Sequence, residues 1–189
     1  MEQHITVLVQ ASKNGNKDAF GDLYHAYIER IYRFVYYKTH HKETAEDLTS
    51  KVFFKVFNKI DGFDEEKGTF TAWIYRIARN TVIDHYRQSR PQMNIDDVWG
   101  LCGDQDIERD AHIMLSMEKV EKHLVELSGD QREILIMRVW QELSYKEIAD
   151  IMNKSEESCR MAYSRAIKKL QHIVPTGLFL ALISSRLFQ

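Results

Sequence analysis

The sequence predicts an all-α protein made of two small helical domains that are joined by an acidic, flexible linker. The first observation behind this prediction is the scarcity of glycine and proline, 8 and 2 in 189 residues, which leaves few turn residues for an all-β architecture. The second is a spacing of apolar residues by three and four positions in both halves of the chain. The third is an acidic stretch without helical period between the two halves.

The first predicted domain spans residues 1–90. Its expected elements are helices over residues 17–38, 44–57 and 71–89, with a loop over residues 61–68 before the last helix. Asn16 is the expected N-cap of the first helix, because apolar residues recur on one helical face after it. Thr44 and Asp47 form a capping arrangement at the start of the second helix, and Pro91 marks the end of the third.

The second predicted domain spans residues 116–173 and contains four helices. Their expected ranges are residues 117–126, 130–140, 145–152 and 156–173. Ser128 with Gln131, and Ser144 with Glu147, fit the capping box that satisfies free amides at a helix start. The last two helices are separated by a turn over residues 153–155, which is the spacing of a helix-turn-helix.

Two further segments lie outside these domains. The linker over residues 91–115 carries six acidic residues and one arginine, with one proline and two glycines. Its Trp99 either packs locally or docks on a domain of this chain or on a partner. The apolar tail over residues 174–189 either folds back as a further packing helix or forms an exposed handle for a regulator.

The composition bounds the compartment and the chemistry. No stretch reaches the roughly 20 apolar residues of a membrane span, and the N-terminus lacks the basic and apolar start of a secretory signal. Cys102 and Cys159 are far apart and outside any Cys-x-x-Cys pattern, which argues against a disulfide or zinc framework. We therefore expect a cytoplasmic protein with no metal and no cofactor.

The charge is unevenly distributed along the chain. The 26 basic and 28 acidic residues give a net charge of −2, which by itself predicts no nucleic-acid partner. Basic residues nevertheless exceed acidic ones over residues 72–90 and 153–172, on either side of the acidic linker. These two basic segments are the candidates for contact with a phosphate backbone.

The last predicted helix has an apolar and a polar face. The apolar stripe consists of Cys159, Ala162, Tyr163, Ala166, Ile167 and Leu170. The opposite face presents Glu157, Arg160, Met161, Ser164, Arg165 and Lys168. Arginine can hold guanine with two hydrogen bonds and serine can pair with several base edges, so this face suits a major groove. A solvated amphipathic helix would show the same pattern, but the preceding helix and turn add the docking geometry.

The third helix of the first domain carries an arginine stripe. Arg76, Arg79, Arg87 and Arg90 lie within an arc of roughly 80° at about 100° per residue. Aromatic residues lie beside this stripe, namely Phe63, Phe70, Trp73 and Tyr75. Rings next to a basic track can bind unstacked bases, although Trp73 also fits a place in the core. The loop with Lys67, Gly68 and Thr69 is suited to close around an extruded base.

Three passages carry a family resemblance. They are Ala45-Glu-Asp-Leu-Thr49; Phe70-Thr-Ala-Trp-Ile-Tyr-Arg-Ile-Ala-Arg-Asn80 with Asp84 and Arg87; and Leu127-Ser-Gly-Asp-Gln-Arg-Glu-Ile-Leu135 leading into Leu143-Ser-Tyr-Lys-Glu-Ile-Ala149. In this order they resemble the extracytoplasmic-function (ECF, group IV) sigma factors of bacterial RNA polymerase, within the sigma-70 family. The resemblance covers about residues 14–172.

The resemblance implies sigma domain 2 over residues 1–90 and sigma domain 4 over residues 116–173. Such a factor binds core RNA polymerase, recognises the −35 and −10 elements of a promoter and promotes melting, with no small-molecule substrate. An anti-sigma factor, often attached to the membrane in this family, is the implied regulator. The protein would then lie at the nucleoid when active and at the inner face of the membrane when held. The linker would thread through polymerase channels as a mimic of nucleic acid, unless it is a solvated spacer.

The resemblance also assigns three sets of contacts. Duplex −35 DNA is expected at Ser155, Glu157, Ser158, Arg160, Met161, Ser164, Arg165 and Lys168. Single-stranded −10 DNA is expected at Phe63, Lys67, Gly68, Thr69, Phe70, Trp73, Arg76, Arg79, Asn80 and Arg87. Core polymerase is expected at Asp47, Leu48, Ser50, Lys51, Phe53 and Phe54. Ser50 and Lys51 stand where the family usually has glutamine and glutamate.

Two other functions compete with this interpretation. A stand-alone helix-turn-helix regulator would explain residues 144–169 but would leave the basic and aromatic helix of the first domain unused. An enzyme acting on nucleic acid would need ligands that converge from fixed elements. The acidic residues instead crowd the predicted linker, and His85 stands singly on a helix. We therefore expect no enzymatic activity.

Overall fold

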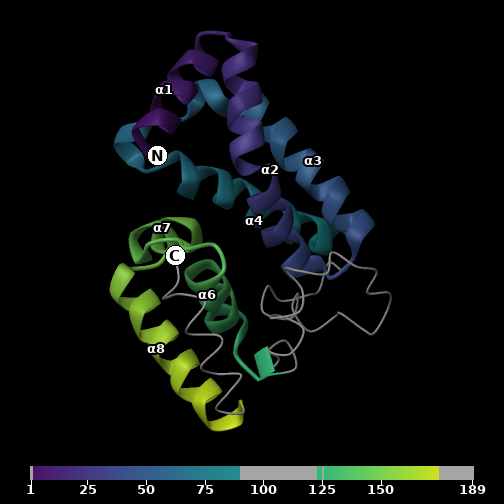
Figure 1. The fold of residues 1–189 in the computed structure, drawn as a ribbon. Helices are drawn as coiled ribbons and strands as arrows, with labels where there is room; N and C mark the ends of the chain where they lie inside the picture. The colour runs from purple at the N-terminus through teal and green to yellow at the C-terminus, as the bar shows by residue number, and fades with distance from the viewer. Residues whose placement is uncertain (1, 90–122, 125, 175–189) are drawn as a thin grey trace. The chain divides into compact units, whose positions relative to one another are not determined.

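The computed structural model describes residues 2–89, 123–124 and 126–174. Within these residues the chain forms α-helices and two short 3-10 turns and no strand (Figure 1), so the predicted all-α class is confirmed. Arg90, the predicted linker, nearly all of the helix predicted over residues 117–126 and the tail beyond residue 174 lie outside the described residues. The described residues fall into two helical units.

The N-terminal unit contains four α-helices. These are α1 (Glu2–Lys13), α2 (Lys17–Thr39), α3 (Lys42–Lys59) and α4 (Phe70–Ser89), with the 3-10 turns η1 (Ile60–Gly62) and η2 (Glu65–Lys67) between α3 and α4. The sequence did not predict α1, which packs against α2 and buries Leu8, Val9 and Ser12. The α1–α2 turn includes Gly15 at φ +82°, a conformation that glycine adopts without a steric penalty.

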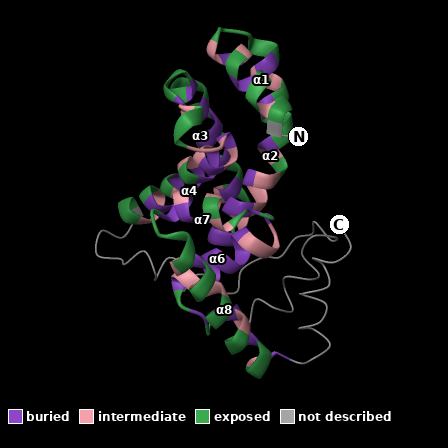
Figure 2. Ribbon diagram, turned by 90° about the vertical axis from the view of Figure 1, so that its left-hand side faces the viewer, coloured by how far each residue is buried: buried purple, intermediate pink, exposed green. Residues whose placement is uncertain are grey.

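The core of this unit lies between α2, α3 and α4. Ile31, Phe34, Leu48 and Tyr75 are at most 1% exposed, and Figure 2 colours such buried residues along these helices. The rings of Phe34 and Tyr75 meet edge to face with their centroids 5.1 Å apart, an arrangement that favours aromatic pairs. Burial raises the pKa of the Tyr75 hydroxyl, so this group stays protonated within the core.

The helix starts explain where the predicted boundaries hold and where they fail. The side chain of Asn16 accepts hydrogen bonds from the amides of Asp18 and Ala19 at 3.0 and 3.1 Å, which confirms the predicted N-cap of α2. The prediction that the next helix begins at Thr44 is wrong by two residues, because His41 is the N-cap. Its Nδ1 accepts from the Thr44 amide at 3.3 Å, so Thr44 lies in the first turn.

The C-terminal unit contains α6 (Gly129–Val139), α7 (Tyr145–Met152) and α8 (Glu156–Ile173). Both predicted capping boxes are confirmed: Ser128 pairs reciprocally with Gln131, and Ser144 pairs with Glu147. The bounds of α7 and α8 coincide with the predicted ones. Leu135, Ile148, Cys159 and Leu170 are fully buried and join the three helices. None of the described helices is both long and apolar enough to cross a membrane.

Candidate nucleic-acid and protein interfaces

The two faces of α8 are arranged as the apolar period predicts. Cys159, Ala166 and Leu170 are buried, and Ala162, Tyr163 and Ile167 are half-buried. The opposite face leaves its side chains exposed, namely Glu157, Arg160, Met161, Ser164, Arg165 and Lys168. Met161 on this face is 48% exposed. The polar face of α8 is therefore available for contact along about three turns.

The helix-turn-helix is held by contacts between its helices. Ser155 caps α8 by accepting from the Ser158 amide at 3.2 Å, and Lys154 in the turn pairs with Asp130 at the start of α6. The ring of Tyr145 on α7 lies edge to face with that of Tyr163 on α8, 5.9 Å between centroids. These contacts fix the direction in which α8 presents its polar face.

Arg160 occupies the first exposed turn of α8 in a defined position. Its guanidinium lies over the ring of Tyr145, with the carbon Cζ 5.1 Å from the centroid, and it pairs with Glu156 one turn earlier. The hydrogen bond and the charge of Glu156 raise the pKa of this guanidinium further above neutrality. The bond to Glu156 uses Nη2, so the remaining N–H donors of this guanidinium are held in a defined position from which they can reach DNA.

The loop between α3 and α4 is built on an aromatic cluster. The centroids of the Phe63, Phe70 and Trp73 rings lie between 5.3 and 5.6 Å apart, and Phe70 also meets Tyr27 at 5.4 Å. Phe63 and Phe70 are 6% and 5% exposed, so their rings pack inside the unit rather than facing a base. Trp73 is half-buried and is the ring of this cluster with an accessible part.

Polar contacts shape the loop itself. The Asp64 carboxylate accepts from the Glu66 amide at 3.1 Å and pairs with Lys67 at 2.8 Å. The hydrogen bond from Lys67, followed by that from the Glu66 amide, lowers the pKa of the Asp64 carboxyl. Gly68 lies at φ +155° and ψ +176°, a region that is essentially restricted to glycine. Thr69 then accepts from the Ala72 amide at 3.1 Å and so caps α4.

The arginine stripe of α4 is only partly exposed. Arg76, Asn80 and Arg87 are exposed, whereas Arg79 is half-buried and has interactions within the chain. Tyr75, which the sequence placed beside the stripe, is fully buried. The described part of the stripe therefore offers two exposed arginines, Arg76 near the loop and Arg87 at the other end of α4, with Asn80 exposed between them.

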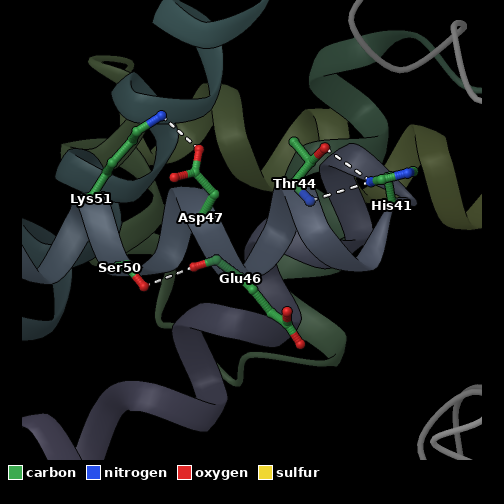
Figure 3. Close-up of polar contacts among 6 residues, drawn as sticks. All are labelled: His41, Thr44, Glu46, Asp47, Ser50 and Lys51. Carbon is green, nitrogen blue, oxygen red and sulfur yellow. Dashed lines mark hydrogen bonds and ion pairs between the residues drawn. The ribbon is translucent and has the colours of Figure 1, made fainter.

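The outer face of α3 combines an ion pair with exposed rings. Figure 3 shows Lys51 reaching back to Asp47, at 2.6 Å, and the hydroxyl of Ser50 donating to the carbonyl oxygen of Glu46 at 3.0 Å. Phe54 is 70% exposed. Leu48 and Phe53 are 1% and 6% exposed, which corrects their assignment to a partner surface.

Other aromatic side chains on α2 and α3, not assigned to a site from the sequence, extend this surface. Phe57 is 51% exposed and meets Phe20 of α2 edge to face at 5.0 Å. Tyr24 of α2 is 38% exposed and lies 4.7 Å from the ring of Phe53. The available sequence signal was for Phe57 alone, which is three residues after Phe54 on the same helix. We call Phe54, Phe57, Phe20 and Tyr24 the α2–α3 aromatic surface.

Comparison with known proteins gives the family. Residues 23–92 match Sigma-70 region 2, and residues 117–170 match Sigma-70 region 4. The chain is 31% identical over 157 residues to ECF RNA polymerase sigma factor SigM of Bacillus subtilis, across 82% of this chain and 95% of SigM. The chain belongs to the ECF sigma factors. The resemblance read from the motifs is therefore confirmed.

One further ECF relative is similar to this chain in sequence, and two solved structures are similar to it in fold. ECF RNA polymerase sigma factor BldN of Streptomyces coelicolor is 33% identical over 172 residues, and the chain covers 65% of its length. The fold is similar to that of CnrH, solved with the cytosolic domain of CnrY, at a TM-score of 0.70, 21% identity and coverage of 90% and 97% of the two chains. RpoE of Bartonella quintana, solved with the anti-sigma factor NepR, gives a TM-score of 0.67 at 24% identity, over 82% and 96%. The relatives are named as sigma factors, a class of transcription factor rather than of enzyme.

Proposed function

We propose that this ECF sigma factor binds core RNA polymerase, recognises a promoter through a −35 and a −10 element, and promotes melting of the duplex. The observation that carries the proposal is the presence of two unlike polar surfaces on one chain. One is the exposed face of α8 behind a helix-turn-helix, which suits duplex DNA. The other is the exposed part of α4 with its ordered loop, which suits an extruded base.

For the −35 element, the proposed surface is the exposed face of α8 and its cap. It consists of Ser155, Glu157, Ser158, Arg160, Met161, Ser164, Arg165 and Lys168. The hydroxyl of Ser155 and the backbone of Ser158 already form the cap, so these two residues position the helix, whose start is suited to a phosphate. Arg160 and Arg165 are exposed and are the candidates for two-hydrogen-bond contacts with guanine.

For the −10 element, the proposed surface is the loop and the exposed part of α4. It consists of Lys67, Gly68, Thr69, Trp73, Arg76, Arg79, Asn80 and Arg87. Phe63 and Phe70 support the loop from below, because their rings are buried against each other and against Trp73. A flipped base would then meet the backbone of the loop and the accessible edge of Trp73.

For core polymerase, the proposed surface is the outer face of α3 with the α2–α3 aromatic surface. Asp47, Ser50, Lys51 and Phe54 are exposed there. Large exposed rings beside a few charges are typical of protein–protein contact sites, in which buried aromatic anchors supply most of the binding free energy. We propose that an anti-sigma factor covers the same surface and so competes with the polymerase.

The test is transcription in vitro with purified core polymerase and fragments of genomic DNA from the source organism, followed by mapping of the 5′ ends. We expect a discrete set of start sites with a shared two-part upstream element, and transcription only when both the chain and core polymerase are present. Specific DNA binding that is equally tight with and without core polymerase would instead identify a stand-alone regulator. Cleavage or chemical modification of the DNA by the chain would identify an enzyme.

A further inference from the structure

The loop that precedes α4 is held from outside by α1, a helix that the proposed function does not use. Lys13, the last residue of α1, donates a hydrogen bond from Nζ to the carbonyl oxygen of Phe63 at 2.8 Å. Gln10, one turn earlier, donates from Nε2 to Oε1 of Glu65 at 3.4 Å. The helix also contacts η1 and α4, so it touches the elements on both sides of the loop.

Lys13 binds the start of the loop, next to Asp64, whose carboxylate holds the residues that follow. The carbonyl oxygen to which it donates immediately precedes Asp64, whose carboxylate holds the Glu66 amide and Lys67. The Asp64 carboxyl has a lowered pKa, mainly through Lys67 and the Glu66 amide, and the charge of Lys13 adds to the lowering. Lys13 is half-buried, although lysine side chains are mostly exposed. Its ammonium group is thus committed to this loop.

We propose that Lys13 is a positioning residue, which holds residues 63–69 in the shape that captures an unpaired base of the −10 element. The inference rests on the proposed function, since it assigns a support to the loop that reads the base. A binding loop gains affinity when its bound shape is already populated in the free protein, because less conformational entropy is lost on binding. The anchor on the Phe63 carbonyl restricts the start of the loop, and the cap at Thr69 restricts its end.

The first test follows the loop in the full-length protein by hydrogen exchange. The amides of Glu66 and Lys67 bond to the side chain and the carbonyl oxygen of Asp64, so they report its closure. Lys13→Met should speed their exchange by about fivefold, as expected for the loss of one typical hydrogen bond at a partly exposed site. Lys17→Met removes the same charge from an exposed position at the start of α2 and should leave these amides unchanged.

The second test measures DNA binding by the complex with core polymerase. The probe is a fragment of a promoter mapped as above, pre-melted over its −10 element, and a second fragment carries only the duplex −35 element. Lys13→Met should weaken binding to the pre-melted fragment by about fivefold and leave the duplex fragment unaffected. Lys13→Arg, which retains a donor and the charge, should restore most of the loss.

The results separate the inference from the proposed function. If the wild-type complex shows no preference for the pre-melted fragment, the proposed function fails and the base-capture role fails with it. If that preference exists but Lys13→Met changes neither loop exchange nor binding, the inference alone is overturned. Equal weakening by Lys13→Met and Lys17→Met would also overturn it, because the lysine would then act only as a general positive charge.

Discussion

Replacement of Gly68 by alanine tests whether the loop conformation matters for both stability and DNA binding. Gly68 lies at φ +155° and ψ +176°, where any residue with a Cβ is strained by about 1–3 kcal/mol. Gly62→Ala is a matched control from the same loop, because it has no positive φ and an added Cβ meets nothing within 4 Å. Alanine also reduces the entropy of the unfolded chain in both variants, by about 0.4–1 kcal/mol. The strain at residue 68 therefore appears as the difference in the free energy of unfolding between the two variants.

The assay is native-state hydrogen exchange of the most protected amides in α2 and α4, which exchange only when the N-terminal unit unfolds. A loss of about 1–3 kcal/mol makes them exchange about fivefold to 150-fold faster in Gly68→Ala than in Gly62→Ala. If the loop relaxes instead, the stability is retained, but binding to a pre-melted −10 fragment falls selectively. Equal exchange and equal binding in the two variants would refute the reasoning.

Three further variants probe the remaining surfaces. Arg165→Ala should weaken binding to the duplex −35 element by about 1–3 kcal/mol if the side chain reads a base, with unchanged binding to core polymerase; transcription at the wild-type level would remove Arg165 from the −35 surface. Phe54→Ala should weaken core polymerase binding by about tenfold and change the free energy of unfolding by no more than about 0.5 kcal/mol from the wild type. The control is Val7→Ala, at a side chain 65% exposed on α1, which should change neither polymerase binding nor stability. Equal polymerase binding by Phe54→Ala and the wild type would exclude the α2–α3 aromatic surface. Cys159 is fully buried, and burial raises the pKa of its thiol. In a Cys102→Ser background, a thiol reagent should therefore label Cys159 only as fast as the C-terminal unit opens. Labelling in native buffer at the rate of a free thiol would contradict that burial.

Helices with explicit end signals were predicted closely from the sequence, and those without such signals were not. The bounds of α7 and α8 agree because a capping box or a serine cap marks each start. The helix α1 follows Met1, which is not among the preferred N-cap residues. It was therefore missed, although Ile5, Leu8, Val9 and Ser12 are spaced as on one helical face. The start of α3 was misplaced because histidine is not among the preferred N-cap residues.

The candidate sites were predictable as surfaces but not side chain by side chain. On α8 a single apolar stripe separates inside from outside, so its polar face followed from the period alone. The loop before α4 has no helical period, and on α3 only Phe54 lies opposite the stripe of Leu48, Val52 and Val56. For the other aromatic residues, tertiary packing decides which of them are covered. Phe63, Phe70 and Phe53 turned inward, whereas Phe54 and Phe57 remained outside. A pattern of residue types cannot distinguish these cases, because aromatic rings serve equally well in cores and in interfaces.

Arg160 illustrates why exposure alone does not rank the candidates on the −35 surface. Its guanidinium already lies over Tyr145 and against Glu156, so little rotamer freedom is left to lose when DNA binds. The bond to Glu156 uses Nη2 alone, so the other guanidinium donors can meet base acceptors, with a strict requirement on position. Lys168, about two turns further along an exposed face, has a flexible stem and a compact charge that can follow a phosphate. We therefore expect the first turns of α8 to supply base selectivity and its later turns to supply the salt-dependent part of the affinity.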